Sequence, residues 1–298
     1  MRKNSKTMNL LLKINLESLA WSFRRVHVPV NKNELVLEVG SGGNPYFRSN
    51  VLIDAYLDTR ERHYVKLISD RPTVLGFAEN LPFRDDSFDF VIASHVLEHS
   101  KDPGKFLSEL QRVSKAGYIE VPDAFFERLA NYLDHRLEIT DIDSKLIIRK
   151  KKNYIQDQEI HDLVHNKVSE VFEEIVSKYP FRFNVRYYWS RDNGGIKYEI
   201  LNPNYEFDWD PPLTTKSESS ATLMAVIKGG LLKLFRKYLS QNKRNKSVDL
   251  LDIIMCPNCR KSEHDNPNGQ WTMDNGQCRC NNCNSSYDII KNNIIKFN

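Results

Sequence analysis

Residues 35–45 read Leu-Val-Leu-Glu-Val-Gly-Ser-Gly-Gly-Asn-Pro, a short apolar run that ends in a glycine-rich loop. A run of this length that stops at glycines is typical of a buried parallel strand. Glycines allow positive φ angles and let a ligand approach the backbone closely. Open α/β sheets bind nucleotides at the loop after their first strand, so the stretch predicts a cofactor site at residues 40–43. A plain turn is the alternative interpretation.

Further apolar runs follow the first one, and helical or polar stretches separate them. Strands are expected at 51–53, 73–77, 88–93 and 118–121, and helices at 58–69 and 102–115. Strands that alternate with helices predict an α/β, Rossmann-like fold with a mostly parallel sheet. Only eleven residues separate Val39 from Val51, so the first crossover must be a very short helix or a loop.

Asp54 ends the second expected strand. A carboxylate at this place can accept two hydrogen bonds from the diol of a ribose, although an Asp at a strand end is often only a turn residue. An NAD site fits less well, because the third glycine of that fingerprint is missing and Asp54 follows the loop too soon.

Three more motifs follow in order, namely Ala78-Glu79-Asn80-Leu81-Pro82-Phe83, Asp85-Asp86-Ser87-Phe88-Asp89-Phe90-Val91 and Ser94-His95-Val96-Leu97-Glu98-His99. Together with the glycine loop, they resemble class I S-adenosylmethionine (SAM)-dependent methyltransferases over about residues 35–122. The resemblance is closest to the branch that includes quinone-biosynthesis methyltransferases. It implies a methyltransferase that binds SAM and transfers its methyl group to an acceptor that the sequence does not identify.

The resemblance also assigns positions around SAM. It implies that Glu38, Gly40 and Gly42 line the methionine end of the cofactor, and that Ser41 and Gly43 of the same loop also contact it. Asp54 would hold the ribose, and Ala78 and Glu79 would lie beside the adenine. Ser94 and His95 would close the site after the fourth strand. Two positions depart from the family pattern. Phe77 stands where an acid usually hydrogen-bonds the adenine, and Asn44 follows the loop where a third glycine is usual.

A hydroxyl acceptor needs its proton removed near the transition state, whereas other acceptors need no dedicated base. The candidates are His95, His99, Asp123 and His135, and a structural role is an equal alternative for each. The stretch 95–99 also matches the H-x-x-E-H pattern of zinc proteases, but it follows a buried strand in a methyltransferase-like order. His161 and His165 lie one helical turn apart, which fits a metal pair or, more simply, a solvated helix face.

All five cysteines lie in the last 43 residues. The pairs Cys256/Cys259 and Cys280/Cys283 have the spacing of a structural Zn²⁺ site, and a reducing compartment disfavours disulfides. Cys278 is spare. The segment resembles the small zinc-binding proteins that activate tRNA, rRNA and protein methyltransferases. That resemblance implies a zinc ribbon, fused here to a methyltransferase and docked on its own catalytic domain.

The remaining patterns give the domain organisation. We expect an N-terminal amphipathic helix (1–30), a methyltransferase domain (31–205), a linker with a basic amphipathic helix (206–249) and a zinc ribbon (250–298). Within the second of these, a hairpin is expected at 136–150, a long helix at 157–178 and a late antiparallel hairpin at 181–201, around the turn 192–195.

The composition is that of a globular chain, with 298 residues, 40% apolar and 28% charged, and a net charge of +4. No run of 18 apolar residues and no signal peptide is found, so we expect a cytoplasmic protein. Basic patches at 1–30 and 221–246 fit helices packed on the domain, or contact with a membrane surface or RNA. Two functions remain open, an active methyltransferase and a non-catalytic SAM-fold scaffold.

Overall fold

The computed structural model describes residues 3–62, 64–153, 157–210, 230, 232, 234–261, 270–291 and 293–297. The chain divides into two compact units that alternate along the sequence. The first unit comprises 1–29, 93–107 and 116–213, and the second comprises 30–92, 108–115 and 214–298.

The second unit is built on a mostly parallel sheet. Its strands β1 (Val36–Val39), β2 (Val51–Asp54) and β3 (Thr73–Leu75) pair in parallel, and β4 (Phe90–Ser94) lies beside β1. Every residue of β1, β2 and β3 is buried, as expected for strands covered on both faces. The strands predicted from the apolar runs are confirmed.

The crossover from β1 to β2 is a loop without a helix, as its length predicts. Two buried side chains hold it. Glu38 accepts hydrogen bonds from the Tyr46 N–H (2.8 Å) and the Ser49 hydroxyl (2.5 Å), and Arg71 donates to the carbonyls of Tyr46 (3.2 Å) and Ser49 (2.6 Å). These side chains satisfy backbone groups that a helix would otherwise pair.

The helix predicted over 58–69 is wrong. Among the described residues of this stretch, the helical structure is limited to a short 3₁₀ turn, η1 (Arg60–Arg62). The Arg62 guanidinium donates to the carbonyls of Tyr56, Leu57 and Val65, so these carbonyls bond a side chain in place of a helical backbone.

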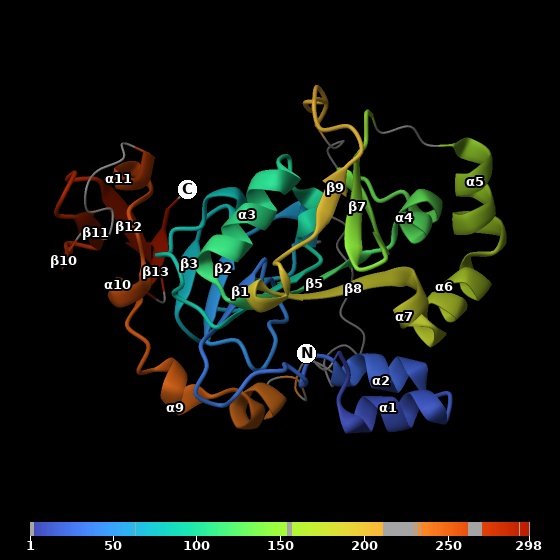
Figure 1. Cartoon of the computed structure of the whole chain (residues 1–298), viewed down its shortest axis with the longest axis horizontal. Helices are drawn as coiled ribbons and strands as arrows, with labels where there is room; N and C mark the ends of the chain where they lie inside the picture. The colour runs from blue at the N-terminus through green and yellow to red at the C-terminus, as the bar shows by residue number, and fades with distance from the viewer. Residues whose placement is uncertain are drawn as a thin grey trace. The chain divides into compact units, whose positions relative to one another are not determined.

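The C-terminal part of the chain extends the same sheet in the second unit. Strands β10 (Trp271–Asp274), β11 (Gln277–Cys280), β12 (Ser286–Ile290) and β13 (Ile294–Lys296) form an antiparallel series, and β13 pairs in parallel with β3 (Figure 1). The strand order in this unit is β10-β11-β12-β13-β3-β2-β1-β4. Its short helical elements are η2 (Ala78–Asn80), α9 (Asn242–Asn245), α10 (Leu250–Ile253) and α11 (Pro257–Lys261). Helix α3 (Pro103–Val113) is divided between the two units.

The first unit contains two small sets of strands. Strand β5 (Ala116–Pro122) pairs antiparallel with β8 (Asn184–Ser190), and β6 (Leu137–Ile142) forms the predicted hairpin with β7 (Lys145–Lys150). Strand β9 (Tyr198–Ile200) pairs in parallel with β7, so the two strands of 181–201 do not pair with each other. The turn η5 (Arg191–Asn193) links them.

Helices complete the first unit, and two of the predicted helices are interrupted. The N-terminal helix divides into α1 (Lys6–Lys13) and α2 (Glu17–Phe23), because Asn15 has a φ of 59°. The long helix divides into α5 (Gln158–Asp162), the π-helical turn η4 (Leu163–Lys167) and α6 (Ser169–Lys178). The other helical elements are η3 (Leu97–His99), α4 (Ala124–Ala130) and α7 (Pro180–Phe183).

Most of the predicted linker and basic helix lies outside the described residues, although 234–239 are helical. Within the described residues, no helix combines the length and the apolar character needed to cross a membrane.

Candidate functional site

The glycine loop and Asp54 lie side by side in the second unit. Gly40 and Gly42 have φ angles of 67° and 58°, which favour glycine. The Gly40 N–H donates to the Ile53 carbonyl (2.9 Å), and the Gly42 N–H donates to Oδ2 of Asp54 (2.9 Å). The chain therefore joins the loop after β1 to the carboxylate at the end of β2, which is the arrangement that the sequence predicts.

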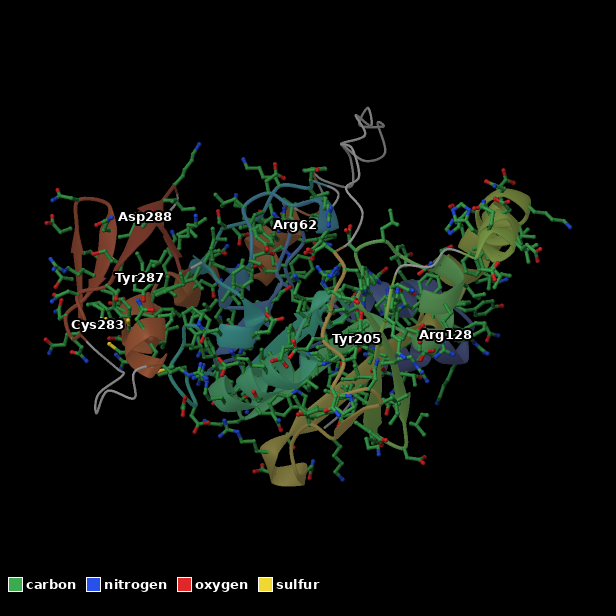
Figure 2. The ribbon with its side chains drawn as sticks, turned by 90° about the horizontal axis from the view of Figure 1, so that it is seen from above. Arg62, Arg128, Tyr205, Cys283, Tyr287 and Asp288 are labelled. Carbon is green, nitrogen blue, oxygen red and sulfur yellow. The ribbon has the colours of Figure 1, made fainter. Side chains whose placement is uncertain are left out.

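Arg62 occupies the other side of this carboxylate. Its Nη1 atom lies 2.7 Å from Oδ1 of Asp54, and the two side chains are only 13% and 8% exposed. The Tyr56 N–H also donates to Oδ1 (3.2 Å). Both oxygens of Asp54 thus have protein partners, and Arg62, labelled in Figure 2, provides the only one that carries a charge among the described residues.

The segment that carries Arg62 packs directly on the glycine loop. The Ile68 N–H donates to the Gly42 carbonyl (3.1 Å). A Cβ atom added to Gly43 would lie 2.4 Å from Cγ1 of Val65, so this position excludes any side chain. This contact could not be inferred from the sequence, because a helix over 58–69 would have placed Arg62 without reference to the loop.

The other predicted cofactor residues of the second unit have mixed environments. Glu38 is buried and anchors the first crossover, and the buried Ser41 hydroxyl has no hydrogen-bond partner among the described residues. Ala78 is buried and Glu79 is half-buried. Phe77, which replaces the usual acid, is 44% exposed and packs edge-on against Tyr56 at 5.8 Å between ring centroids.

The first unit contains a buried charged cluster around Glu120 of β5. Arg24 donates to both Glu120 oxygens, from Nε at 2.7 Å and from Nη2 at 3.0 Å. The hydroxyls of Ser94 (2.9 Å) and Tyr118 also donate to this carboxylate. Burial alone would raise the pKa of Glu120, but the hydrogen bond from His95 and the charge of Arg24 hold it well below its ordinary value.

His95 links this cluster to a second carboxylate. Its Nε2 atom lies 3.2 Å from Glu120 and its Nδ1 atom 3.5 Å from Glu98, and its φ of 55° is unusual for a residue other than glycine. Desolvation lowers the pKa of His95, but the carboxylates of Glu120 and Glu98 outweigh it and raise the pKa to about 9. His95 is therefore an imidazolium at neutral pH, which makes it a poor general base.

The other candidate bases also have partners. Asp123 caps α4 by accepting from the Phe125 N–H (2.9 Å), and its other oxygen accepts from the Thr140 hydroxyl (2.7 Å). Such a fully bonded carboxylate fits a structural role.

Both remaining histidines are held through Nδ1. His99 contacts the Asp134 carbonyl at 2.9 Å, and His135 contacts Glu127 at 2.6 Å. These two histidines and Glu98 place their ligand atoms within 4.8 Å of one another. His95 is not in this group, so the zinc-protease interpretation of residues 95–99 does not match the structure. His161 and His165 lie with their ring centroids 4.6 Å apart on the partly exposed α5 and η4.

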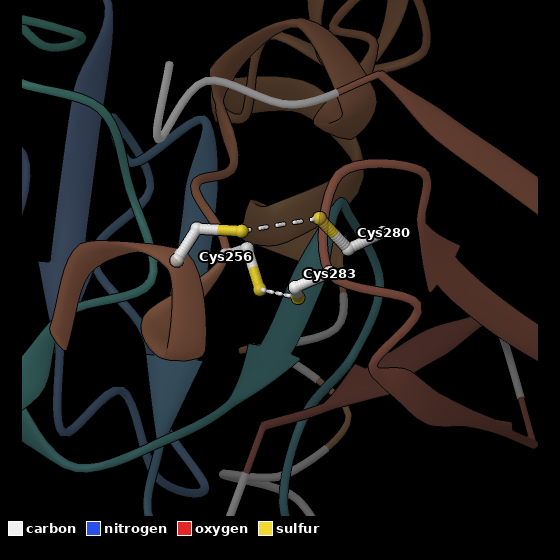
Figure 3. A group of neighbouring side chains, drawn as sticks. Cys256, Cys280 and Cys283 are labelled. Carbon is white, nitrogen blue, oxygen red and sulfur yellow. Dashed lines mark hydrogen bonds between the residues drawn. The ribbon is translucent and has the colours of Figure 1, made fainter. Parts of the chain in front are cut away.

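The four predicted metal ligands Cys256, Cys259, Cys280 and Cys283 converge, with all four sulfurs within 4.8 Å of one another. The Sγ atoms are 3.6 Å apart both in Cys256–Cys283 and in Cys259–Cys280 (Figure 3). Tetrahedral zinc with bonds of about 2.3 Å requires sulfurs roughly 3.8 Å apart, so the cluster fits this ion. Cys278 is buried outside the group.

Three sets of backbone and ionic contacts among the described residues join the cysteine-bearing segment to the rest of the second unit. Residues Ile295 and Lys296 of β13 pair with Val74 and Leu75 of β3. The backbones of 82–84 and 253–255 exchange hydrogen bonds of 2.9 and 3.1 Å. Arg260 binds both oxygens of the buried Glu109, at 2.5 and 2.7 Å.

Parts of the chain are similar to known proteins. Residues 37–119 match the family model described as a methyltransferase domain. The uncharacterized protein YafE of Escherichia coli is 36% identical over 72 residues, which are 24% of this chain and 33% of that protein. The uncharacterized protein MJ1123 of Methanocaldococcus jannaschii is 30% identical over 94 residues, 30% of this chain and 43% of that protein. The matches thus cover less than half the length of these curated relatives.

A solved structure of similar fold is the complex between the Haloferax volcanii Trm112 methyltransferase activator and a methyltransferase. It is 15% identical, with a TM-score of 0.36, and the match covers 65% of this chain and 94% of that chain. The sheet topology gives the class of the chain, a Rossmann-like α/β protein, in which residues 37–119 are similar to a methyltransferase domain.

Proposed function

We propose that this chain is a SAM-dependent methyltransferase. The observation that carries the proposal is the 2.9 Å hydrogen bond between the Gly42 N–H and Asp54, within a loop whose glycines take positive φ angles. This bond fixes a carboxylate acceptor beside a backbone that a ligand can approach closely. Such a pair can grip the ribose and the methionine portion of one cofactor, and the matched methyltransferase domain includes both residues.

Bound SAM supplies an electrophilic methyl group on a sulfonium sulfur. The chain's part in the reaction is to hold the acceptor in line with that methyl group and to exclude water. Asp54 accepts hydrogen bonds from the ribose hydroxyls, and residues 40–43 contact the methionine end. Glu38 keeps the loop in place through Tyr46 and Ser49. The exposed aromatic pair Tyr56 and Phe77 offers the adenine a stacking surface in place of the usual acid.

Binding of this kind requires Arg62 to leave Asp54, because the guanidinium already bonds Oδ1. The same contact supports a second candidate function, a non-catalytic scaffold that uses the fold without the cofactor. The contact between Val65 and Gly43 also supports the scaffold, because the valine side chain packs on the loop. The convergent carboxylate and glycines favour the enzyme, because a scaffold has no need of an acceptor at that place.

We further propose that Cys256, Cys259, Cys280 and Cys283 hold a structural zinc ion in a ribbon formed by residues 250–298. Four thiolates close the coordination sphere, so this metal has no open position for catalysis. The ribbon docks on its own methyltransferase sheet through β13. Cysteines that are not joined in disulfides persist in a reducing compartment, which supports a cytoplasmic location.

Calorimetric titration of the full chain with SAM tests the main proposal. The native chain should bind, and Asp54→Asn should weaken binding about tenfold or more, because a hydrogen bond to a charged group contributes about 1.5–3 kcal/mol. Asp58→Asn, at an exposed acid four residues along, is the matched control and should leave the affinity unchanged. Absence of binding at millimolar SAM would reject the enzyme and leave the scaffold.

A further inference from the structure

We propose that Glu98, His99 and His135 form a binding site for a divalent transition-metal ion in the first unit. Glu98 and His99 come from the turn η3, and His135 lies just before β6. Their ligand atoms lie within 4.8 Å of one another, so a single ion can reach all three. This site is distinct from the cysteine cluster, and the inference does not depend on the proposed function.

The carboxylate is the first argument. The Glu98 side chain is only 2% exposed, and neither of its oxygens has a hydrogen-bond partner among the described residues. A buried charged group normally has several such partners, and leaving it without them is costly. Its nearest cationic group is His95, whose Nδ1 atom lies 3.5 Å away. A metal ion would supply the partner that the carboxylate oxygens lack.

The orientation of the two imidazoles is the second argument. His99 contacts the Asp134 carbonyl through Nδ1, and because that oxygen can only accept, Nδ1 carries the proton. His135 contacts the Glu127 carboxylate through Nδ1 in the same way. In this tautomer of both rings, Nε2 is the nitrogen that can bind a metal ion. A metal-binding histidine is usually fixed by such a hydrogen bond from its other nitrogen to a carbonyl or carboxylate.

Glu127, which bonds His135, is itself held by a further residue. Lys151, itself buried, lies 2.5 Å from the second oxygen of Glu127. Glu127 is therefore held between Lys151 and His135, one partner on each oxygen. The rings of His99 and His135 meet edge-on, with centroids 4.8 Å apart at 90°. The chain thus holds the donors in one arrangement before any ion arrives.

The donor set indicates which ions fit. Two imidazoles and one carboxylate suit divalent manganese, iron, cobalt or zinc better than calcium, and the absence of thiolate distinguishes this site from the cysteine cluster. Three protein ligands leave at least one position open for water or for an oxygen atom of a ligand. The site is therefore of the kind that can lower the pKa of a bound hydroxyl. The competing interpretation is an internal ion pair in which protonated histidines neutralise Glu98.

Manganese binding distinguishes a metal site from an internal ion pair. Mn²⁺ prefers oxygen and nitrogen donors and leaves the zinc of the cysteine cluster in place. The full chain is loaded with one equivalent of zinc for the cysteine cluster, freed of excess zinc and titrated with Mn²⁺, and the free Mn²⁺ is measured by electron paramagnetic resonance. One Mn²⁺ should bind per native chain. Glu98→Gln and His135→Ala should each weaken binding at least tenfold, and Glu127→Gln should do so by about 10- to 100-fold, as supporting residues of metal sites do.

His165→Ala is the matched control, since it removes an outlying histidine of the same unit, and it should bind Mn²⁺ like the native chain. Circular dichroism melting establishes that each variant is folded, and Glu98→Gln, which keeps the side-chain shape, covers the case in which His135→Ala unfolds. Failure of the native chain to bind Mn²⁺ or Co²⁺ would overturn the proposal, as would binding that Glu98→Gln leaves unchanged. SAM affinity is measured separately, so either proposal can fail alone.

Discussion

Replacing Arg62 by alanine should tighten the binding of SAM. In the present structure Arg62 lies 2.7 Å from Oδ1 of Asp54, the atom that the proposed function assigns to the ribose. Oδ1 already accepts from both Arg62 and the Tyr56 N–H, which use its two lone pairs, so each SAM molecule that binds must displace Arg62. The alanine variant leaves the carboxylate free of its charged partner.

The size of the effect follows from the environment of the pair. Both side chains are largely buried, at 13% and 8% exposure, so the contact is worth more than a surface ion pair. A hydrogen bond to a charged group contributes about 1.5–3 kcal/mol net, which corresponds to a change in affinity of roughly 10- to 100-fold. Loss of the bonds from Arg62 to Tyr56, Leu57 and Val65 also loosens the segment over the loop. We therefore expect the lower end, about tenfold tighter binding.

Calorimetric titration of SAM into the native chain, Arg62→Ala and Arg62→Lys measures this effect. The lysine variant keeps the charge but loses the forked geometry, so its affinity should fall between the other two. Lys66→Ala removes a charge from an exposed position of the same segment and should behave like the native chain. If Arg62→Ala binds SAM more weakly than the native chain while Lys66→Ala does not, Arg62 supports the cofactor site and the reasoning is wrong.

Three further outcomes test the packing of the second unit and its metal. Ile295→Ala, at a fully buried residue of β13, should lower the unfolding free energy by about 2–5 kcal/mol in denaturant titration. A loss of less than about 0.5 kcal/mol would show that β13 is not docked on β3. Gly43→Ala should cost about 1–3 kcal/mol because its Cβ would meet a valine methyl at 2.4 Å, whereas Gly104→Ala, with contacts no closer than 3.6 Å, should be neutral or stabilising. Cys280→Ser should lose the bound zinc measured by mass spectrometry and Cys278→Ser should keep it; zinc loss in both would show that the ligand set is wrong.

Local sequence patterns predicted the central strands and the cysteine cluster well. A fully buried parallel strand requires an apolar run, and β1 and β2 lie where such runs stand. The four cysteines were predictable because their spacing forms two knuckles, which is a local property, and a shared ion then requires the knuckles to meet. The loop in place of the first helix was predictable from the short spacing between Val39 and Val51.

Contacts between distant segments were not predictable in this way. Strand β8 pairs with β5 and β9 with β7, although the turn between them favours a hairpin, because strand partners depend on tertiary packing that a turn does not encode. Arg62 was missed for the same reason. The sequence does indicate that Glu120 needs a partner, because a carboxylate within the apolar strand β5 is buried. It does not indicate which residue that partner is, since Arg24 lies 96 residues away.

The position of β13 connects the metal cluster to the cofactor site. An open sheet that ended at β3 would leave a row of unpaired backbone groups at its edge, and β13 pairs with them at Val74 and Leu75. The Phe297 N–H then donates to the Leu75 carbonyl (2.8 Å), two residues before the exposed Phe77 that the proposed function places beside the adenine. A ribbon of this size has too little core to fold without its metal. If the cysteines hold the proposed zinc, the ion therefore stabilises strand β3, which ends two residues before Phe77, and loss of zinc should disturb SAM binding without any direct contact between metal and cofactor.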